Sequence, residues 1–187
     1  MFAVLFSSML NKISCGFKGK DRRMIQDALE LAVKIHSRHT RDDGEPYILH
    51  PYRAALILER EFDVCDAGII AAALLHDVLE MSRVSGNKLE LRFGNRVASM
   101  VRLVTKPRKR DSRGWEERYY RRIRAAGGGA QLVKFADRLD NIRDLHNASK
   151  AKQRRYLKAT KERFLPWMKE ADVRFYNKLV KEIRKFG

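Results

Sequence analysis

The sequence predicts an all-α protein built as a bundle of helices, and three observations support this. Residues 69–75 are apolar nearly all round, which is typical of a helix buried inside a domain. Residues 21–39 and 87–104 repeat their apolar side chains with the 3.6-residue period of an amphipathic helix. No segment shows the apolar–polar alternation that would convincingly predict a strand.

The length and composition favour one compact domain. The chain has 187 residues, of which 44% are hydrophobic, enough for a sizeable core. We expect residues 1–20 to form a mobile N-terminal extension, because their composition differs from that of the rest. Residues 21–187 are expected to form a single helical domain that ends in basic helices.

Cysteine usage and hydropathy indicate a cytoplasmic protein. The two cysteines, Cys15 and Cys65, give no spacing typical of a disulfide framework or a thiolate metal site. No apolar run is long enough to span a bilayer, so we expect no membrane span. The oligomeric state is left open by the sequence.

The first predicted helix begins at Asp21, a candidate N-cap, and runs to about His39. We expect His36, at the edge of its apolar face, to be a core histidine or to support a site rather than to bind metal. A polar break at Arg41–Pro46 follows. Pro51 suits the first turn of the next helix, so His50 stands at a helix entrance.

The central apolar helix, with Asp66 as its candidate N-cap, carries an imidazole and two carboxylates near its C-terminal end. They belong to His76, Asp77 and Glu80, and residues three and four apart share a helix face. Burying carboxylates is costly without a partner, and a bound metal ion is an economical one. The alternative is a helix end that emerges into solvent with ordinary polar residues.

Two further helices are predicted between the helix at 87–104 and the basic C-terminal segment. The apolar positions of that helix are Leu89, Leu91, Phe93, Val97, Met100, Val101 and Val104. A basic loop at Lys106–Gly114 leads into an arginine-rich helix at Trp115–Ala126, which the three glycines at 127–129 end. The next helix is expected at Gln131–Asn147.

Acidic residues recur along the helix expected at Gln131–Asn147. Asp137 and Asn141 are four apart and share a face. For the other two acidic positions, Asp140 and Asp144, we expect salt bridges with the arginines of the same helix, Arg138 and Arg143.

The net charge of +17 is concentrated in two segments. Residues 106–124 hold nine basic and three acidic side chains, and residues 150–187 hold thirteen and four. The second segment predicts two basic amphipathic helices over Ala151–Phe186, with Pro166 interrupting them or starting the second. Such a surface could steer a polyanionic substrate or bind nucleic acid. For most of these residues we favour solvated helix faces.

Four scattered residues can be assembled into a metal site if their helices converge. They are His50, His76, Asp77 and Asp137. A mixed set of imidazoles and carboxylates suits manganese, iron or zinc better than calcium, which prefers oxygen ligands only.

Three stretches then carry a resemblance to a known family. They are RDDGEPYILHP at 41–51, ALLHDVLE at 73–80 and LVKFADRLDNIRDL at 132–145. In this order and spacing they resemble the HD phosphohydrolase superfamily, and within it the hydrolase domain of Rel/SpoT-type proteins and the small alarmone hydrolases. The resemblance covers roughly residues 21–165.

The resemblance implies an all-α HD-domain bundle and a manganese-dependent phosphohydrolase that removes the 3′-pyrophosphate from the guanosine tetra- and pentaphosphate alarmones. Another divalent transition metal would serve the same chemistry. Carried over by position, the metal ligands are His50, His76, Asp77 and Asp137, and the residue that handles the attacking water is Glu80. Asn141 matches a nucleotide-contacting position and Arg41 a basic one near the substrate. Physical reasoning adds Lys134 and Arg138 as neutralisers of phosphate charge.

Two positions depart from the pattern of alarmone hydrolases. In that family an aspartate usually follows the glutamate of the metal helix, but here the residue is Met81, and Asp42 stands where a lysine is usual. These departures leave metal binding intact and open an alternative to the enzyme, a nucleotide sensor that hydrolyses poorly. The basic segments at Lys106–Arg124 and near the C-terminus give a third, less favoured alternative, a nucleic-acid-associated protein.

Overall fold

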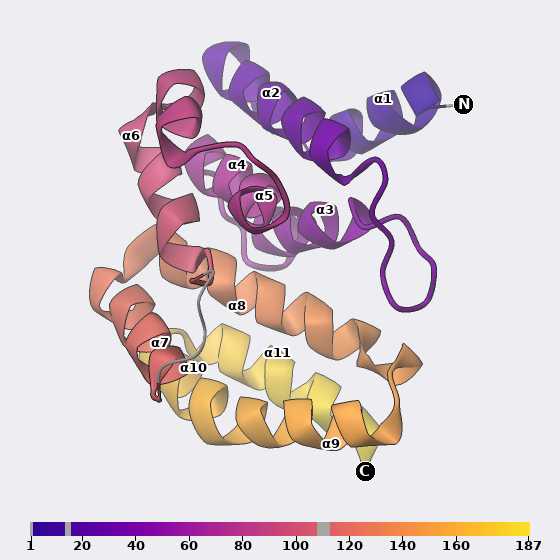
Figure 1. Ribbon diagram of the computed structural model, residues 1–187, viewed down its shortest axis with the longest axis vertical. Coiled ribbons are helices and arrows are strands. Elements are labelled where there is room, and N and C mark those ends of the chain that lie inside the picture. Colours follow the sequence, from indigo (N-terminus) through magenta and orange to yellow (C-terminus); the bar gives the residue numbers. More distant parts are fainter. Residues whose placement is uncertain (1, 14–15, 108–112) are drawn as a thin grey trace.

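The computed structural model describes residues 2–13, 16–107 and 113–187, and over this part of the chain the protein is helical (Figure 1). The only β-type pairing within these ranges is an isolated bridge between Thr40 and Pro46. The all-α prediction is therefore confirmed.

The α-helices are α1 Phe2–Ile13, α2 Gly19–His36, α3 Leu49–Leu56, α4 Ala67–Leu75, α5 Val78–Met81, α6 Gly86–Val104, α7 Trp115–Ala126, α8 Gly128–Arg143, α9 Lys150–Ala159, α10 Leu165–Ala171 and α11 Val173–Ile183. Wider π-helical turns at Ile57–Glu61 and Thr160–Phe164 extend α3 and α9, and short 3₁₀ segments follow α8 and α11 at Asp144–Asn147 and Arg184–Phe186.

Helix α4 is the buried centre of the N-terminal half. Every one of its residues is buried, and it packs against α2, α3, α6 and α8. Its N-cap is Asp66, whose side chain accepts hydrogen bonds from the main-chain N–H groups of Gly68 and Ile69. Both the buried central helix and its cap were predicted from the sequence.

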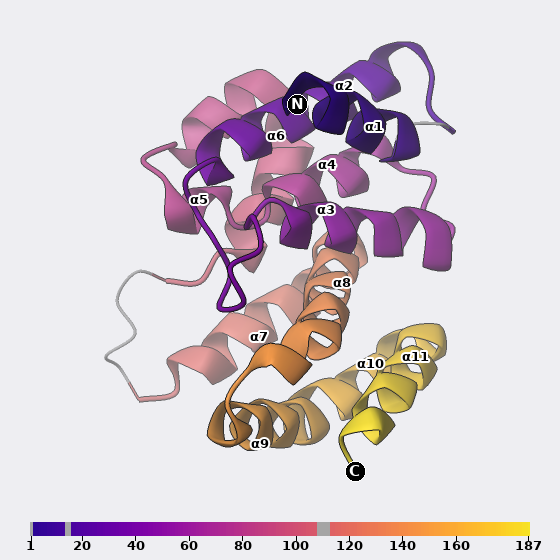
Figure 2. The same ribbon diagram turned by 90° about the vertical axis from the view of Figure 1, so that its right-hand side faces the viewer.

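Helix α8 joins the two halves of the molecule. Figures 1 and 2 show it between the helices of residues 2–104 and those of the C-terminal third. It packs against α3, α4 and α6 on one side and against α7 and α11 on the other. Side chains that point from α8 towards α3 and α4 therefore meet residues far away in the sequence.

Several predicted boundaries need correction. Helix α2 begins at Gly19, so Asp21 lies in its first turn and is not the N-cap. Helix α4 ends at Leu75, and a turn at residues 76–77 separates it from the one-turn helix α5. Helix α8 begins at Gly128, earlier than predicted, because Gly127 adopts a φ of 60° and allows the chain to turn directly from α7 into α8.

Helix α6 confirms the predicted segment but contains a kink at Gly94, where φ is 81°. Leu91, which we assigned to the apolar face, is 90% exposed, whereas the other predicted apolar positions are buried. Leu91 precedes this kink and lies two residues from both Leu89 and Phe93, about 200° around the helix, so its exposure follows from the helical repeat itself.

The N-terminal residues form a helix that contacts the domain. Met9 and Ile13 of α1 are buried, and the Tyr52 hydroxyl donates to the Met9 carbonyl at 3.2 Å. The division into an extension at 1–20 and a domain at 21–187 stays a prediction.

The C-terminal segment contains three α-helices where we predicted two. Pro166 lies in the first turn of α10, whose N–H groups need no helical partner. Pro166 thus starts the second helix of the segment, one of the two roles predicted for it. A further break falls at Asp172, whose side chain caps α11 by accepting a hydrogen bond from the main-chain N–H of Arg174. No helix within the described ranges is long and apolar enough to cross a membrane.

Candidate active site

The loop before α3 places His50 at the domain centre. The chain folds back on itself at Thr40–Pro46, and Pro51 in the first turn of α3 fixes the backbone beside His50. The imidazole is only 2% exposed and faces α4 and α8. Asp140 of α8 accepts a hydrogen bond from Nδ1 of His50 at 2.7 Å. This bond leaves Nε2 with its lone pair, pointing away from Asp140.

His76 and Asp77 occupy the turn between α4 and α5, and both side chains are buried. Nδ1 of His76 donates to the Ala73 carbonyl at 2.8 Å, so the Nε2 atom again carries a lone pair. The Tyr47 hydroxyl donates to Oδ2 of Asp77 at 2.7 Å and holds that carboxylate towards the histidines.

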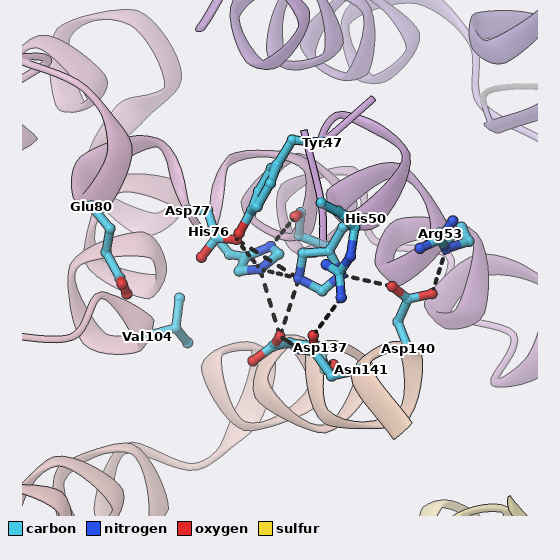
Figure 3. Close-up of polar contacts among 12 residues, drawn as sticks. Tyr47, His50, Arg53, His76, Asp77, Glu80, Val104, Asp137, Asp140 and Asn141 are labelled. Atoms are coloured by element: carbon cyan, nitrogen blue, oxygen red, sulfur yellow. Dashed lines mark hydrogen bonds and ion pairs between the residues drawn. The ribbon is translucent and has the colours of Figure 1, made fainter. Parts of the chain in front are cut away.

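These side chains converge with Asp137 of α8 into one cluster (Figure 3). The two histidine Nε2 atoms are 3.2 Å apart, and Oδ1 of Asp137 lies 3.3 Å from that of His50 and 3.8 Å from that of His76. Oδ2 of Asp77 lies 3.2 Å from Nε2 of His76 and 3.7 Å from that of His50. His50, His76 and Asp137 form a set of ligand atoms that could hold one ion. All four predicted ligands are thus brought together.

The donor set fits a divalent cation. Two imidazole lone pairs and two carboxylates face one another in a buried space, and such an arrangement repels itself unless a positive charge lies between its members. Burial lowers the pKa of His50, but the carboxylates of Asp137 and Asp140 more than offset this and raise it to about 9. A metal ion would replace that proton.

Two residues that hydrogen-bond the cluster were not predicted from the sequence to do so. Asp140, expected to form a local salt bridge, instead binds His50, and its other oxygen accepts from Nε of Arg53 at 2.8 Å. Tyr47, treated only as part of a motif, holds Asp77. Carboxylates and hydroxyls behind metal ligands orient them. The sequence marked Asp140 only as one of several acidic residues that recur along a predicted helix.

The predicted partners of the other charged residues on α8 were also wrong. Asp144 pairs with Nε of Arg41 at 2.6 Å, and Arg143 makes a two-pronged contact with Glu61 at 2.6 and 2.9 Å. Arg138 has no carboxylate partner among the described residues. Its guanidinium lies 4.2 Å from the ring centre of Tyr156 and 3.9 Å from that of Phe164. These contacts join residues far apart in the sequence, so the spacing of residues along one helix could not predict them.

Glu80 lies apart from the metal cluster. Figure 3 shows its carboxylate beside Val104, away from the two imidazoles. The turn at residues 76–77 rotates α5 relative to α4, so Glu80 does not share the helix face predicted for it. Its Oε1 accepts from the main-chain N–H of Lys106 at 2.7 Å, and its Oε2 lies 3.6 Å from the Lys106 ammonium.

Lys134 forms an ion pair with a member of the cluster, Asp137. Its ammonium lies 2.6 Å from Oδ2 of Asp137, and the side chain is buried. Burial disfavours the charged form, but Asp137 raises the pKa of Lys134 above its usual value. In this arrangement the lysine balances the carboxylate as well as lining the cavity.

The Thr40–Pro46 loop is tied to the C-terminal third of the chain. Arg41 donates to Oδ1 of Asn141 at 3.0 Å in addition to its pair with Asp144. Asp42 forms an ion pair with Lys152 of α9, which lowers the pKa of Asp42. The unusual carboxylate at position 42 is therefore neutralised by the protein itself.

A cavity of about 590 Å³ opens onto the cluster, and we call it the main cavity. His50, Asp77 and Asp137 lie at its base, and Glu80 and Met81 line it. Its cationic lining residues within the described ranges are Lys106, Lys134, Arg138, Lys152, Arg155, Lys158 and Arg163. A smaller cavity of about 220 Å³ beside it is lined by Arg41, Asn141 and Tyr156 among others. The shape and charge suit a polyanion larger than a single phosphate.

His36 remains outside the cluster. It is 1% exposed, and its ring packs 5.0 Å from that of Tyr47 and 5.8 Å from that of His39. Burial lowers the pKa of His36 to about 4, which makes it a neutral histidine of the core.

Comparisons with known proteins agree with this geometry. The family model of the HD domain matches residues 28–167. The chain is 38% identical over 145 residues to the guanosine-3′,5′-bis(diphosphate) 3′-pyrophosphohydrolase of Aquifex aeolicus, covering 76% of this chain and 20% of that protein. It is 33% identical over 133 residues to the human enzyme of the same name, MESH1, covering 70% and 74%. It thus spans about a fifth of the bacterial relative and about three quarters of the human one.

A solved structure has a similar fold. It is described as a metazoan ortholog of SpoT that hydrolyzes ppGpp, and it matches with a TM-score of 0.80 and 26% sequence identity. The match covers 91% of this chain and 98% of that one, so helices outside the motifs also correspond.

Proposed function

The chain belongs to the HD domain family, and from this premise we propose that it is a metal-dependent guanosine-3′,5′-bis(diphosphate) 3′-pyrophosphohydrolase. The observation that carries the proposal is the convergence of His50, His76, Asp77 and Asp137 at the base of a cation-lined cavity. The relatives named for this reaction support the choice of substrate.

The proposed ligands of the ion are His50, His76, Asp77 and Asp137, and we propose Mn²⁺ because two imidazoles with two carboxylates form a ligand set of intermediate hardness. When bound, a divalent ion lowers the pKa of water and neutralises charge on a phosphoryl group. Asp140 keeps Nε2 of His50 directed at the ion through the opposite ring nitrogen. Tyr47 does the same for Asp77.

The reaction adds water to a phosphorus of the 3′-pyrophosphate and breaks its bond to the ribose 3′-oxygen, which ends as a hydroxyl. Glu80, on the wall of the main cavity, is the proposed residue that orients the water and accepts its proton. Because Lys106 holds Glu80 away from the cluster, substrate would have to lie between Glu80 and the cluster. Arg41 and Asn141 are the proposed nucleotide contacts, and Lys134 and Arg138 add positive charge around the phosphates.

Met81 supports a second candidate function, a nucleotide sensor that binds but hydrolyses slowly. It lines the main cavity next to Glu80, and a thioether neither accepts a proton at neutral pH nor binds a hard cation well. Asp42 no longer supports that candidate, because Lys152 neutralises it.

Single-turnover hydrolysis of guanosine tetraphosphate at saturating Mn²⁺ separates the two functions. The natural protein is expected to release pyrophosphate, and Glu80→Gln to lose that activity. If a second carboxylate is needed, Met81→Asp will raise turnover about 10²–10⁴-fold, the range of a positioned acid–base group. Robust natural turnover without any gain from Met81→Asp would reject the sensor. No turnover by any variant despite bound metal would reject this substrate.

A further inference from the structure

The wall of the main cavity that α9 and the following π turn form is held in place by long side chains. Among the described helices, α9 is not one of those that pack closely against α8, so side chains bridge the distance between the two. The buried Gln153 fixes the N-terminal part of α9 by donating to the main-chain carbonyls of His146 and Ala148 at 3.2 and 2.9 Å. At the other end of α9, the bridging side chain is that of Arg138 on α8.

Arg138 contacts three elements at once, and its side chain is buried. Its Nη1 donates to Oγ1 of Thr160 at 3.3 Å, and its Nη2 donates to the hydroxyl of Tyr120 on α7 at 3.3 Å. The guanidinium carbon also lies 4.2 Å from the ring centre of Tyr156 and 3.9 Å from that of Phe164. A planar, rigid group with several donors suits such a set of partners, and a lysine ammonium does not.

The π turn at Thr160–Phe164 allows both rings to reach the guanidinium. In an uninterrupted α-helix, residues eight apart differ in direction by about 80°. The wider π turn has more residues per turn, which brings Phe164 back towards the face that carries Tyr156. Thr160 begins this turn and lies between them in sequence, and its hydroxyl donates to the Tyr156 carbonyl at 2.7 Å while accepting from Arg138. The shape of the turn therefore matches the guanidinium that it surrounds.

The same segment carries charged residues that line the main cavity. Lys158, Glu162 and Arg163 are within four residues of Thr160. Their distance from the metal cluster depends on how the turn is held against α8. Arg138 directly follows Asp137, the α8 member of the cluster, so one stretch of backbone fixes both the cluster and the wall.

From these contacts we infer that Arg138 is a positioning residue for the main cavity. It holds the C-terminal end of α9 and the π turn at a set distance from the metal cluster, and this spacing determines how tightly the cavity binds a polyphosphate group. The positioning rests only on the contacts of Arg138. Its effect on an alarmone rests in addition on the proposed function.

Arg138→Lys and Arg138→Met separate positioning from charge, because lysine keeps the charge but cannot replace the planar fork. The Kd for guanosine tetraphosphate is measured by calorimetry on metal-free protein, and KM and kcat are measured at saturating Mn²⁺. We expect both variants to weaken the affinity about tenfold, as for loss of a hydrogen bond to a charged group, and to change kcat less than twofold. Natural affinity in Arg138→Lys but not in Arg138→Met would show that the charge alone acts and would overturn the inference. A fall in kcat at unchanged KM would overturn it too, because the effect would then come through Asp137.

Arg143→Lys is the matched control for a general loosening of α8. Arg143 is a half-buried arginine of the same helix, it makes a two-pronged contact with Glu61, and it lies outside the lining of the main cavity. We expect this variant to lower the Tm while its affinity for guanosine tetraphosphate stays within twofold of the natural value. An equal loss of affinity in Arg143→Lys and Arg138→Lys would assign the effect to stability and overturn the inference.

Thr160→Val tests the same contact from the opposite side and serves if the Arg138 variants fail to fold. It removes the hydroxyl that accepts from Arg138 and keeps the shape of the side chain. We expect a rise in KM of about threefold, the effect of one hydrogen bond. Thr160→Val combined with Arg138→Met should be no worse than Arg138→Met alone, because both changes act on one contact. An unchanged KM in Thr160→Val, or additive effects in the double variant, would contradict the inference.

Inorganic tripolyphosphate, titrated into the metal-free proteins, supplies a probe that does not depend on the alarmone. We expect Arg138→Lys to bind it about tenfold more weakly than the natural protein and Arg143→Lys to bind it equally well. This result in a protein that hydrolyses no guanosine tetraphosphate would leave the positioning role standing and reject the proposed function. Hydrolysis by the natural protein, with equal affinities for both probes in every variant, would leave the proposed function standing and reject the positioning role.

Discussion

The two sides of the main cavity are built on opposite principles. The base, made by α3, α8 and the turn after α4, holds buried groups whose remaining polar atoms are tied to fixed partners such as Asp140 and Tyr47. The wall formed by α9 and the following π turn presents long cations, including Arg155 and Lys158, that are exposed. Fixed geometry suits chemistry at one atom, whereas mobile charge suits attraction of a substrate. The difference predicts that substitutions at the base change turnover and those on the wall change affinity.

The strongest test of this contrast is the removal of a ligand from the base. Asp77→Ala is expected to lose bound metal and to lower turnover more than about 10³-fold, because a metal contributes several kcal/mol to the transition state. Metal analysis and single-turnover rates measure both effects. Asp42→Asn, an exposed carboxylate outside the cluster, should keep its metal; equal metal content in the two variants would contradict the assignment.

Metal removal should also reduce stability. A ligand that binds only the folded state stabilises it by about 2.7 kcal/mol at a hundred times its Kd. Chelation should therefore lower the Tm of the natural protein but barely change that of Asp77→Ala. A matching shift in both proteins would mean that the stabilising ion binds elsewhere.

A smaller loss of metal affinity is expected when the hydrogen-bond partner of a proposed ligand is changed. Asp140→Asn keeps the shape of the side chain but removes the charge that orients His50. Loss of such a partner costs about 10–100-fold in metal affinity. Titration of the metal-free variant with Mn²⁺ measures this, and activity should return at high Mn²⁺ concentration. Activity that stays low at saturating metal would mean that Asp140 acts in some other way.

The contrast also explains what the sequence could predict. His50, His76, Asp77 and Asp137 were identifiable because each lies in a short motif with a chemically unusual side chain. The partner of Asp140 was not predictable, because 90 residues separate it from His50 and helix spacing favoured a local arginine instead. Contacts between distant segments also decide which cations line the wall, so the sequence predicted the positive charge of this segment but not the residues that face the cavity.

Local backbone geometry set the second limit. The turn at residues 76–77 moved Glu80 off its predicted face. Leu91 was assigned to the wrong face, since it lies two residues from both Leu89 and Phe93 in the same part of α6. Helical periodicity assumes an unbroken helix, so a single turn removes its predictive value for the residues directly after it. The predicted fold class was still correct, because several helices indicate it independently and one misplaced side chain does not change it.

On the wall, Arg155→Gln is expected to raise KM about three- to tenfold with little change in kcat, the range for one partly exposed charge contact. The effect should shrink at high salt because exposed charges are screened. Arg154→Gln is the matched control, since Arg154 is the exposed neighbour outside the cavity lining. A drop in kcat with unchanged KM would show that the wall takes part in the chemistry and would break the contrast.

The smallest expected effect concerns the contact between the two halves of the molecule. Glu61, after α3, binds Arg143 of α8 and Lys178 of α11. The hydrogen bond from Arg143 is the main reason that the pKa of Glu61 falls to about 2, with Lys178 adding to the effect and burial opposing it. A carboxyl with a lowered folded-state pKa stabilises the protein above its unfolded pKa of about 4.5, and this stabilisation is lost as the pH falls towards 2.

Because Glu61 is partly exposed, solvent screening limits the contribution to about 1 kcal/mol. Glu61→Gln should therefore lower the free energy of unfolding by that amount at pH 7 and by much less near pH 2.5, measured by urea denaturation at both values. Glu90→Gln is the control, because Glu90 pairs with Arg102 of its own helix and leaves the two halves untouched. A pH-independent loss in Glu61→Gln would mean that packing, and not charge, joins α11 to the domain.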